Sequence, residues 1–337
     1  MLLSAILACG ARHLALIDSR YSEDDALHHH VQATKYLLNS LKSPTRDSTT
    51  CAITSVVLNA YDIVHEHSLQ RMNRLAGARA LIKECGWNAK STGVGAACFW
   101  VNITMELLSC IQFNWQIAWD PDDWGVDMNF TRDAEHGKED VWAYRIVYVL
   151  AKICNFRASM SKSQEGLPSG KLLSMGSPYR QWLKLLSYCD AWDINSPRAM
   201  HPMAYSNSGH EYSPSAFPEV WLVNRVAIAA RLFYHTSMVL LAQTNPVMSV
   251  DHSVEMQNLR NNHSQQIFSI AAHVKHRVVA NIALRSLTIA AECLTDPREQ
   301  EEVLQILARI VRGNGWNVEF ICKDLQKIWG WNDNKHT

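Results

Sequence analysis

The sequence has no excess of charge of either sign. Its 337 residues include 32 lysines and arginines and 32 aspartates and glutamates, so the formal net charge is zero when histidine is neutral. Binding to nucleic acid through the surface as a whole needs a strongly basic chain. The charge balance excludes that class of protein, and any DNA contact would need a local basic patch or a module missing from this chain.

Closely spaced cysteines are also missing. The nine cysteines are scattered, and no two of them form a C-x-x-C motif. Zinc sites and disulfide frameworks place cysteines at characteristic spacings, so the sequence indicates neither. Scattered cysteines are typical of reduced thiols in an intracellular protein.

Alternating polar and apolar residues, the pattern of a strand, are missing as well, whereas helical spacing of apolar residues recurs throughout. The composition, 47% hydrophobic and 19% charged, is that of a globular protein with a sizeable core. These patterns predict an all-α fold, with a single large domain of about ten helices over residues 1–337 and two long loops, at 120–138 and 196–217. Twelve tryptophans are expected to anchor the packed helices.

The helix expected after Ala96 organises the rest of the predicted fold, because it is apolar around almost its whole surface. Its narrow polar stripe consists of Asn102, Glu106 and Ser109. The run approaches the roughly 20 residues that cross a bilayer, but its polar side chains would carry a large insertion penalty. We therefore predict a buried helix of a globular domain and no membrane span.

Several helix ends are predicted from capping residues and prolines. Ser22 followed by Asp25 is a capping-box start, and Gly86 is expected just beyond the end of a helix. A further helix is predicted from Glu139 to Arg157, and another is predicted to open at Pro218.

Two helical patterns have unusual lengths or positions. The pattern from Val254 to Leu294 is longer than a usual globular helix and predicts a break near Asn261. The first residues, Met1 to Leu16, are interpreted as a core helix that is met partway along. We therefore expect the chain to begin inside a domain.

An acidic cluster, Asp122, Asp123 and Asp127, follows the organising helix. Paired carboxylates bind Mg²⁺ and, through it, a diphosphate, and all-α enzymes of this length include terpene cyclases. Such chemistry needs carboxylates fixed on a helix wall, whereas Pro121 places these in a loop, and residues 261–264 lack the glutamate of a second magnesium motif. We expect a solvated acidic loop, and keep a magnesium-dependent, terpene-cyclase-like enzyme as the alternative.

The histidines that could bind a metal occur in three groups: His28 to His30, His65 with His67, and His273 with His276. Consecutive side chains fan around a helix, and residues two apart do not share a face. The third pair could share a face, but no third ligand accompanies it. We therefore expect the histidines of all three groups to lie on the surface and to bind no metal.

The glycine pairs do not indicate a phosphate site. Gly93-Val94-Gly95 precedes a helix but follows no strand, so it lacks the context of a dinucleotide loop. Gly313-Asn314-Gly315 is expected to end a helix. The motifs of serine hydrolases, metalloproteases and P-loop proteins are missing, and we predict no catalytic, cofactor-binding or metal-binding residue.

Five blocks of sequence follow one another in a recognisable order. They are Arg74–Trp87 (RLAGARALIKECGW), Ala97–Leu107 (ACFWVNITMEL) with the acidic Trp124 loop, Phe217–Leu241, His273–Leu284 and Arg298–Trp331. Together they resemble the fungal-specific transcription factor domain, the regulatory region of fungal regulators with a binuclear zinc cluster. The resemblance covers nearly the whole chain.

This resemblance implies an all-α regulatory domain of a nuclear transcriptional regulator. Its expected partners are proteins of the transcription machinery and a second copy of the chain in a homodimer, together with a small effector bound between helices. In the family, six cysteines bind two zinc ions and place a helix in the major groove. This sequence contains no such block. DNA and zinc binding are therefore assigned to no residue here, and we expect either a truncated N-terminus or a protein that has lost the module.

Overall fold

The computed structural model describes residues 1–62, 68–130, 138–165, 176–206, 215–273, 277–314 and 318–331. Its regular structure is almost entirely helical, which confirms the predicted all-α class. The described residues form twelve α-helices, where about ten were expected, together with two short 3₁₀ turns and one two-stranded sheet. The chain divides into two compact units.

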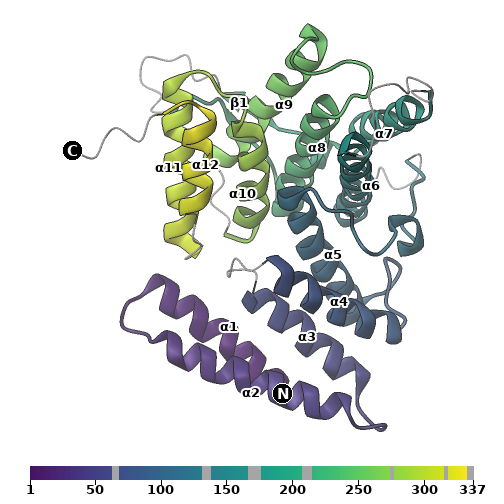
Figure 1. Cartoon of the computed structure of the whole chain (residues 1–337), viewed down its shortest axis with the longest axis vertical. Helices are drawn as coiled ribbons and strands as arrows, with labels where there is room; N and C mark the ends of the chain where they lie inside the picture. The colour runs from purple at the N-terminus through teal and green to yellow at the C-terminus, as the bar shows by residue number, and fades with distance from the viewer. Residues whose placement is uncertain are drawn as a thin grey trace. The chain divides into compact units, whose positions relative to one another are not determined.

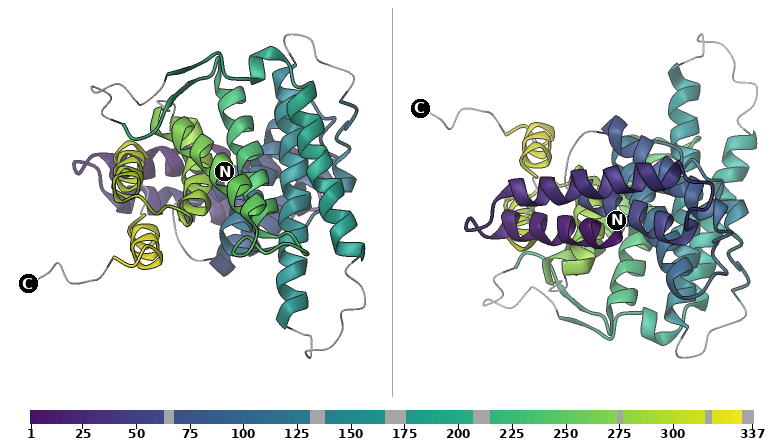
Figure 2. Two further views of the ribbon diagram at one scale, coloured as in Figure 1. Left: turned by 90° about the horizontal axis from the view of Figure 1, so that it is seen from above. Right: turned by 90° about the horizontal axis from the view of Figure 1, so that it is seen from below.

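The first unit contains Met1–Ser109, Asp122–Val126 and Val311–Asn317. Its helices are α1 (Leu2–Ile17), α2 (Glu23–Leu41), α3 (Ser48–Asp62), α4 (Ser68–Glu84) and most of α5 (Gly93–Phe113), followed by the 3₁₀ turn η1 (Pro121–Trp124). Figure 2 shows α1 and α2 side by side as a hairpin, and this hairpin packs on α3. Because alanines fill the inner faces of α1 and α2, the two backbones approach closely.

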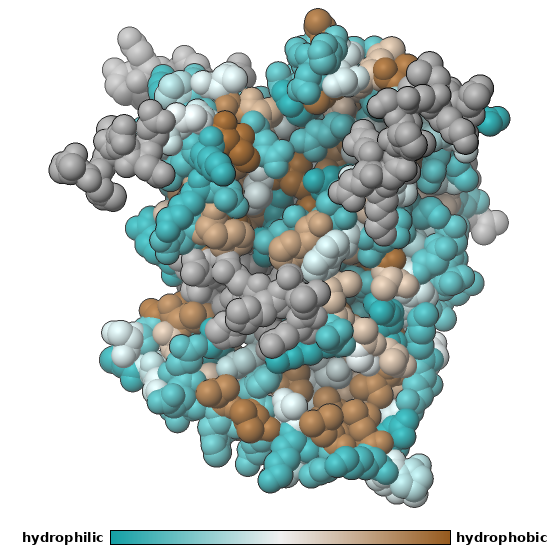
Figure 3. Space-filling model, viewed as in Figure 1, coloured by the Kyte–Doolittle hydropathy of each residue, from teal (hydrophilic) through white to brown (hydrophobic). Residues whose placement is uncertain are grey.

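The prediction that the first helix is a core helix was wrong. Leu3, Ile6 and Leu7 of α1 are 69%, 52% and 44% exposed, and Leu27 and Val31 of α2 are also exposed. Figure 3 shows hydrophobic residues over this hairpin. The sequence pattern indicates how apolar the helix is, but the buried residues of α1 are Ala5, Ala8 and Arg12, and most of its large apolar side chains lie on the exposed face.

Two predicted helix ends are confirmed by their hydrogen bonds. The Ser22 hydroxyl accepts a hydrogen bond from the Asp24 backbone N–H at 3.1 Å, which caps α2. Gly86 has a φ of 70°, and the Trp87 N–H donates to the Ile82 carbonyl oxygen at 3.1 Å. This is the Schellman arrangement, in which glycine adopts the left-handed conformation without steric cost.

The polar stripe of α5 is buried, as predicted. Asn102, Glu106 and Ser109 are each at most 1% exposed. Arg79 of α4 forms an ion pair with Glu106. The burial of Asn102 leaves no room for a glycan on this residue in the folded chain.

The second unit contains Cys110–Pro121, Asp127–Ile310 and Val318–Thr337. Its elements are the end of α5, α6 (Glu139–Glu165), α7 (Gly176–Asn195), η2 (Arg198–Met200), β1 (Ala204–Ser206), β2 (Glu219–Trp221), α8 (Arg225–Gln243), α9 (Val254–His273), α10 (Arg277–Ala291), most of α11 (Pro297–Asn314) and α12 (Glu319–Ile328). α8 is central, since it packs against α6, α7, α9 and α10 (Figure 1). Every residue from 230 to 242 is buried.

Tryptophans join the helices of this unit, as the sequence predicted. The Trp192 indole N–H donates to the Trp142 carbonyl oxygen at 2.8 Å, which links α7 to α6. The Trp182 indole N–H donates to the Leu241 carbonyl oxygen at 2.9 Å, which links α7 to α8. Each ring is buried, so it packs against apolar neighbours while its indole N–H is hydrogen-bonded.

Three predicted boundaries in this unit were wrong. Residues 219–221 pair antiparallel with residues 204–206 instead of opening a helix at Pro218. α8 begins at Arg225, because the Asn224 side chain accepts a hydrogen bond from the Ala227 N–H at 2.8 Å. Asn261, where a break was predicted, lies within α9, and α6 extends beyond Arg157 to Glu165.

Two helices, α5 and α8, are long and apolar enough to cross a membrane by composition alone. Within the protein, however, 72% of the apolar window of α5 and 83% of that of α8 are buried. This burial is the behaviour of core helices in a globular protein.

Candidate functional site

The acidic loop is built around a buried tryptophan. Asp122 and Asp123 are exposed in η1, and Asp127 is also exposed. Trp124 is fully buried and lies edge-on to Phe99, with ring centroids 6.1 Å apart. Among the residues that the structure describes, no three His, Cys, Asp or Glu side chains are placed to hold a metal ion.

The predicted histidine groups have different surroundings. His28 is exposed on α2, and His30 stacks on Tyr61 of α3 at 4.3 Å between ring centroids. His273 lies 3.4 Å from the Phe217 carbonyl oxygen. His65, His67 and His276 lie outside the described residues.

The glycine pair Gly93 and Gly95 lies in the first turn of α5 and allows close packing. A Cβ atom on Gly95 would lie 2.8 Å from the Trp87 ring, so only glycine allows the helix to approach that side chain. Gly313 and Asn314 are at the end of α11, as predicted, and Gly315 lies outside the described residues.

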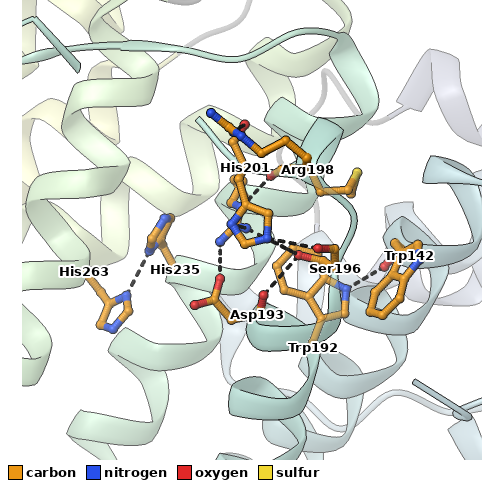
Figure 4. A network of polar contacts seen from close by, with 10 residues as sticks. Trp142, Trp192, Asp193, Ser196, Arg198, His201, His235 and His263 are labelled. Carbon is orange, nitrogen blue, oxygen red and sulfur yellow. Dashed lines mark hydrogen bonds and ion pairs between the residues drawn. The ribbon is translucent and has the colours of Figure 1, made fainter. Parts of the chain in front are cut away.

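A polar network that the sequence did not predict centres on Arg231 of α8, which is 4% exposed. Figure 4 shows two of its partners, Asp193 and His201. Its Nε donates to the Met200 carbonyl oxygen at 2.6 Å, Nη1 pairs with the Asp193 carboxylate, and Nη2 lies 2.6 Å from His201 Nδ1. Since arginine only donates, His201 Nδ1 accepts, and the ring proton is on Nε2. That nitrogen lies 2.9 Å from the Ser196 hydroxyl.

This tautomer agrees with a neutral His201. Burial and the neighbouring Arg231 charge lower the pKa of His201, although the Ser196 carbonyl oxygen and Asp193 oppose this effect. Arg231 also lies over the rings of Trp192 and Tyr234, at 5.1 and 5.6 Å from their centroids. The network therefore fixes the end of α7 and the η2 turn against α8.

A second part of the network is a pair of histidines between α8 and α9. His235 Nδ1 and His263 Nδ1 are 2.8 Å apart, and His235 is 8% exposed (Figure 4). Burial, then His263 and Arg231, lower the pKa of His235 well below its usual value, and burial lowers that of His263 to about 4. Both rings are thus neutral near pH 7, and one donates to the other. They are 28 residues apart in the chain, so no local spacing pattern identifies the pair.

A cavity of about 710 Å³ lies within the second unit, between the end of α5, α6, α10 and α12. Its apolar lining includes Ile111, Phe113, Ile289, Phe320 and Leu325. A volume of several hundred Å³ with mainly apolar walls is typical of small-molecule sites.

The described residues thus define an all-α protein whose buried polar groups join helices and whose cavity has the size of a ligand site. A sequence profile of the fungal-specific transcription factor domain matches residues 1–337. The chain belongs to this family, and the resemblance read from the sequence is confirmed.

A curated relative supports the same assignment. Transcription activator AMTR1 from Alternaria alternata is 24% identical over 215 residues, which cover 58% of this chain and 28% of that protein. The aligned region therefore spans less than a third of the relative's length. No solved structure matches the chain.

Proposed function

We propose that this chain is the regulatory domain of a nuclear transcriptional regulator, which acts through protein partners and a small effector and is not an enzyme. The observation that carries the proposal is the family match over residues 1–337. In this proposal, DNA contact comes from a zinc cluster that is not in this sequence, and zinc is bound only there.

The apolar stripes on α1 and α2 support a role in protein binding. Large exposed hydrophobic side chains gathered on one hairpin mark interaction surfaces more often than isolated ones do. We propose components of the transcription machinery as partners, and a second copy of this chain as a further one. Replacing Leu3 and Leu27 with serine should weaken such association without loss of folding, because both side chains are exposed.

The alternative, a magnesium-dependent enzyme, was motivated by Asp122, Asp123 and Asp127. Their exposure on a short turn and the following segment favours a solvated loop. Binding of an isoprenoid diphosphate that requires Mg²⁺ and is abolished by Asp123→Ala would instead support the enzyme.

A tethering assay tests the proposal. Residues 1–337 would be fused to an unrelated DNA-binding domain, and transcription of a reporter with its binding site would be measured in a fungal cell. We expect a severalfold change relative to the DNA-binding domain alone, and a nuclear location of the untethered protein. A folded fusion that occupies the site and leaves transcription unchanged would contradict the proposal.

A further inference from the structure

The cavity in the second unit has a lining suited to a molecule with an apolar body. Phe113 ends α5, Ile289 belongs to α10, and Phe320 and Leu325 belong to α12 (Figure 1). Apolar contact is favourable but non-directional. These walls therefore select for an apolar ligand of suitable size, and the polar groups among them decide its chemistry.

The charged groups of the lining favour a monoanion. The lining contains three cations, Arg157, Arg285 and Lys327, and two carboxylates, Glu292 and Asp324, which leaves one net positive charge. Arg285 is 7% exposed, and its guanidinium matches a carboxylate in shape and charge. Of these five charged residues, Lys327, Asp324 and Glu292 are exposed and Arg157 is half-buried. The one buried charge among the five is therefore that of Arg285.

Gln112, one of the lining residues, has a side-chain oxygen that lacks a hydrogen-bond donor among the described residues. Gln112 Oε1 is buried and has no hydrogen-bond partner within the part of the chain that the structure describes. A buried acceptor without a partner is costly. A hydroxyl or N–H group on a bound molecule would satisfy it.

We propose that this cavity binds a small monocarboxylic acid whose apolar body carries one hydroxyl or N–H donor. The apolar body packs between α10 and α12, the carboxylate lies near Arg285 and Arg157, and the donor group meets Gln112. The assignment of this cavity as the effector site of a regulator rests on the proposed function. The binding of such an acid in the cavity does not. A bound ligand would join α12 to α5, α6 and α10, and would stabilise the unit.

Calorimetric titration of the full chain with matched probes tests this chemistry. Indole-3-acetate has the anion, the apolar ring and the N–H; indole-3-acetamide lacks the charge, and 1-methylindole-3-acetate lacks the donor. We expect indole-3-acetate to bind with a Kd below about 1 mM, and each analogue to bind about fivefold more weakly or worse, as for the loss of one polar contact.

Substitutions in the lining separate cavity binding from binding elsewhere. Thr288→Phe fills the cavity from α10 and should abolish binding, while Gln112→Leu should remove the preference for the N–H over the N-methyl probe. Lys327→Glu at the rim should weaken binding of the anion about fivefold. Lys323→Glu is the matched control, since Lys323 is 70% exposed on the same helix and does not line the cavity.

The proposal is overturned if indole-3-acetate fails to bind at millimolar concentration, if the amide binds as well as the acid, or if Thr288→Phe leaves binding unchanged while the variant is folded. The tethering assay gives an independent result. Reporter regulation by a chain that binds none of the probes would overturn the cavity assignment alone, whereas probe binding without reporter regulation would overturn the proposed function alone.

Discussion

Arg79 Nη1 lies 3.0 Å from both carboxylate oxygens of Glu106, whose side chain has no exposed surface. The pair joins α4 to the most apolar helix of the first unit. It explains how a carboxylate is accommodated in that helix, because a buried charge is tolerated when it is paired and hydrogen-bonded.

Removing one partner of this pair should lower the free energy of unfolding more than removing both. Arg79→Met removes the arginine that pairs with the buried Glu106 carboxylate and should lower the free energy of unfolding by about 3 kcal/mol or more. The double variant Arg79→Met with Glu106→Leu should recover most of that loss, as measured by urea denaturation. The exposed pair of Arg20 and Asp18 is the control, and Arg20→Met should cost less than about 1 kcal/mol. Equal losses in the single and double variants would contradict this account.

Arg231 should not tolerate a change to lysine. Lysine cannot reach the Met200 carbonyl oxygen, Asp193 and His201 together, since it lacks the fork of a guanidinium. We expect Arg231→Lys to cost about 2 kcal/mol or more in urea denaturation. Arg225→Lys, at an exposed position of the same helix, should change stability by less than about 0.5 kcal/mol.

The His235–His263 pair should make folding sensitive to acid. Because burial lowers the folded-state pKa of His263 from 6.5 to about 4, the unfolded chain binds more protons between these values. The stability contributed by this group is therefore fully present above pH 6.5 and is lost as the pH drops toward 4, by about 3.5 kcal/mol at 1.4 kcal/mol per pH unit.

His263→Gln keeps a hydrogen-bonding side chain beside His235 but removes this titration. The variant should lose less stability than the wild type when urea denaturation is repeated across this pH window. His28→Gln, at an exposed position on α2, should retain the wild-type pH dependence. An identical slope in all three proteins would show that the pair does not titrate as described.

The cysteine thiols should fall into two reactivity classes. Five are buried and four are half-buried, and none of the nine, which all lie within the described residues, is in a disulfide. Burial raises the pKa of Cys154 to about 12 and raises that of Cys189 further, so their thiolates are scarce at neutral pH. We expect at most four thiols to react with a disulfide reagent near pH 8 in the folded protein, and nine in denaturant. Rapid native labelling of Cys154 would contradict its burial.

The sequence predicted what depends on local pattern. Helical spacing gave the all-α class, Ser22 and Gly86 gave helix ends, and the polar stripe of α5 was recognised as buried. These features arise from neighbours within a few turns of one helix.

Features that depend on long-range packing escaped prediction. The exposed face of α1 follows from alanine packing against α2 and α3, and the His235–His263 pair from the packing of α8 on α9. The cavity lining likewise combines α5, α6, α10 and α12. The hydrophobic periodicity of one segment does not predict which distant segment packs against it.

The central claim is that the protein controls transcription, and rapid depletion in its own cell tests this most directly. The chain would be fused to a degradation tag, and nascent RNA would be sequenced within minutes of depletion, with metabolites measured in parallel. The account predicts that nascent transcripts of a discrete set of genes change before any metabolite does. A change in metabolite pools with nascent transcription unaltered would contradict it and would favour an enzyme.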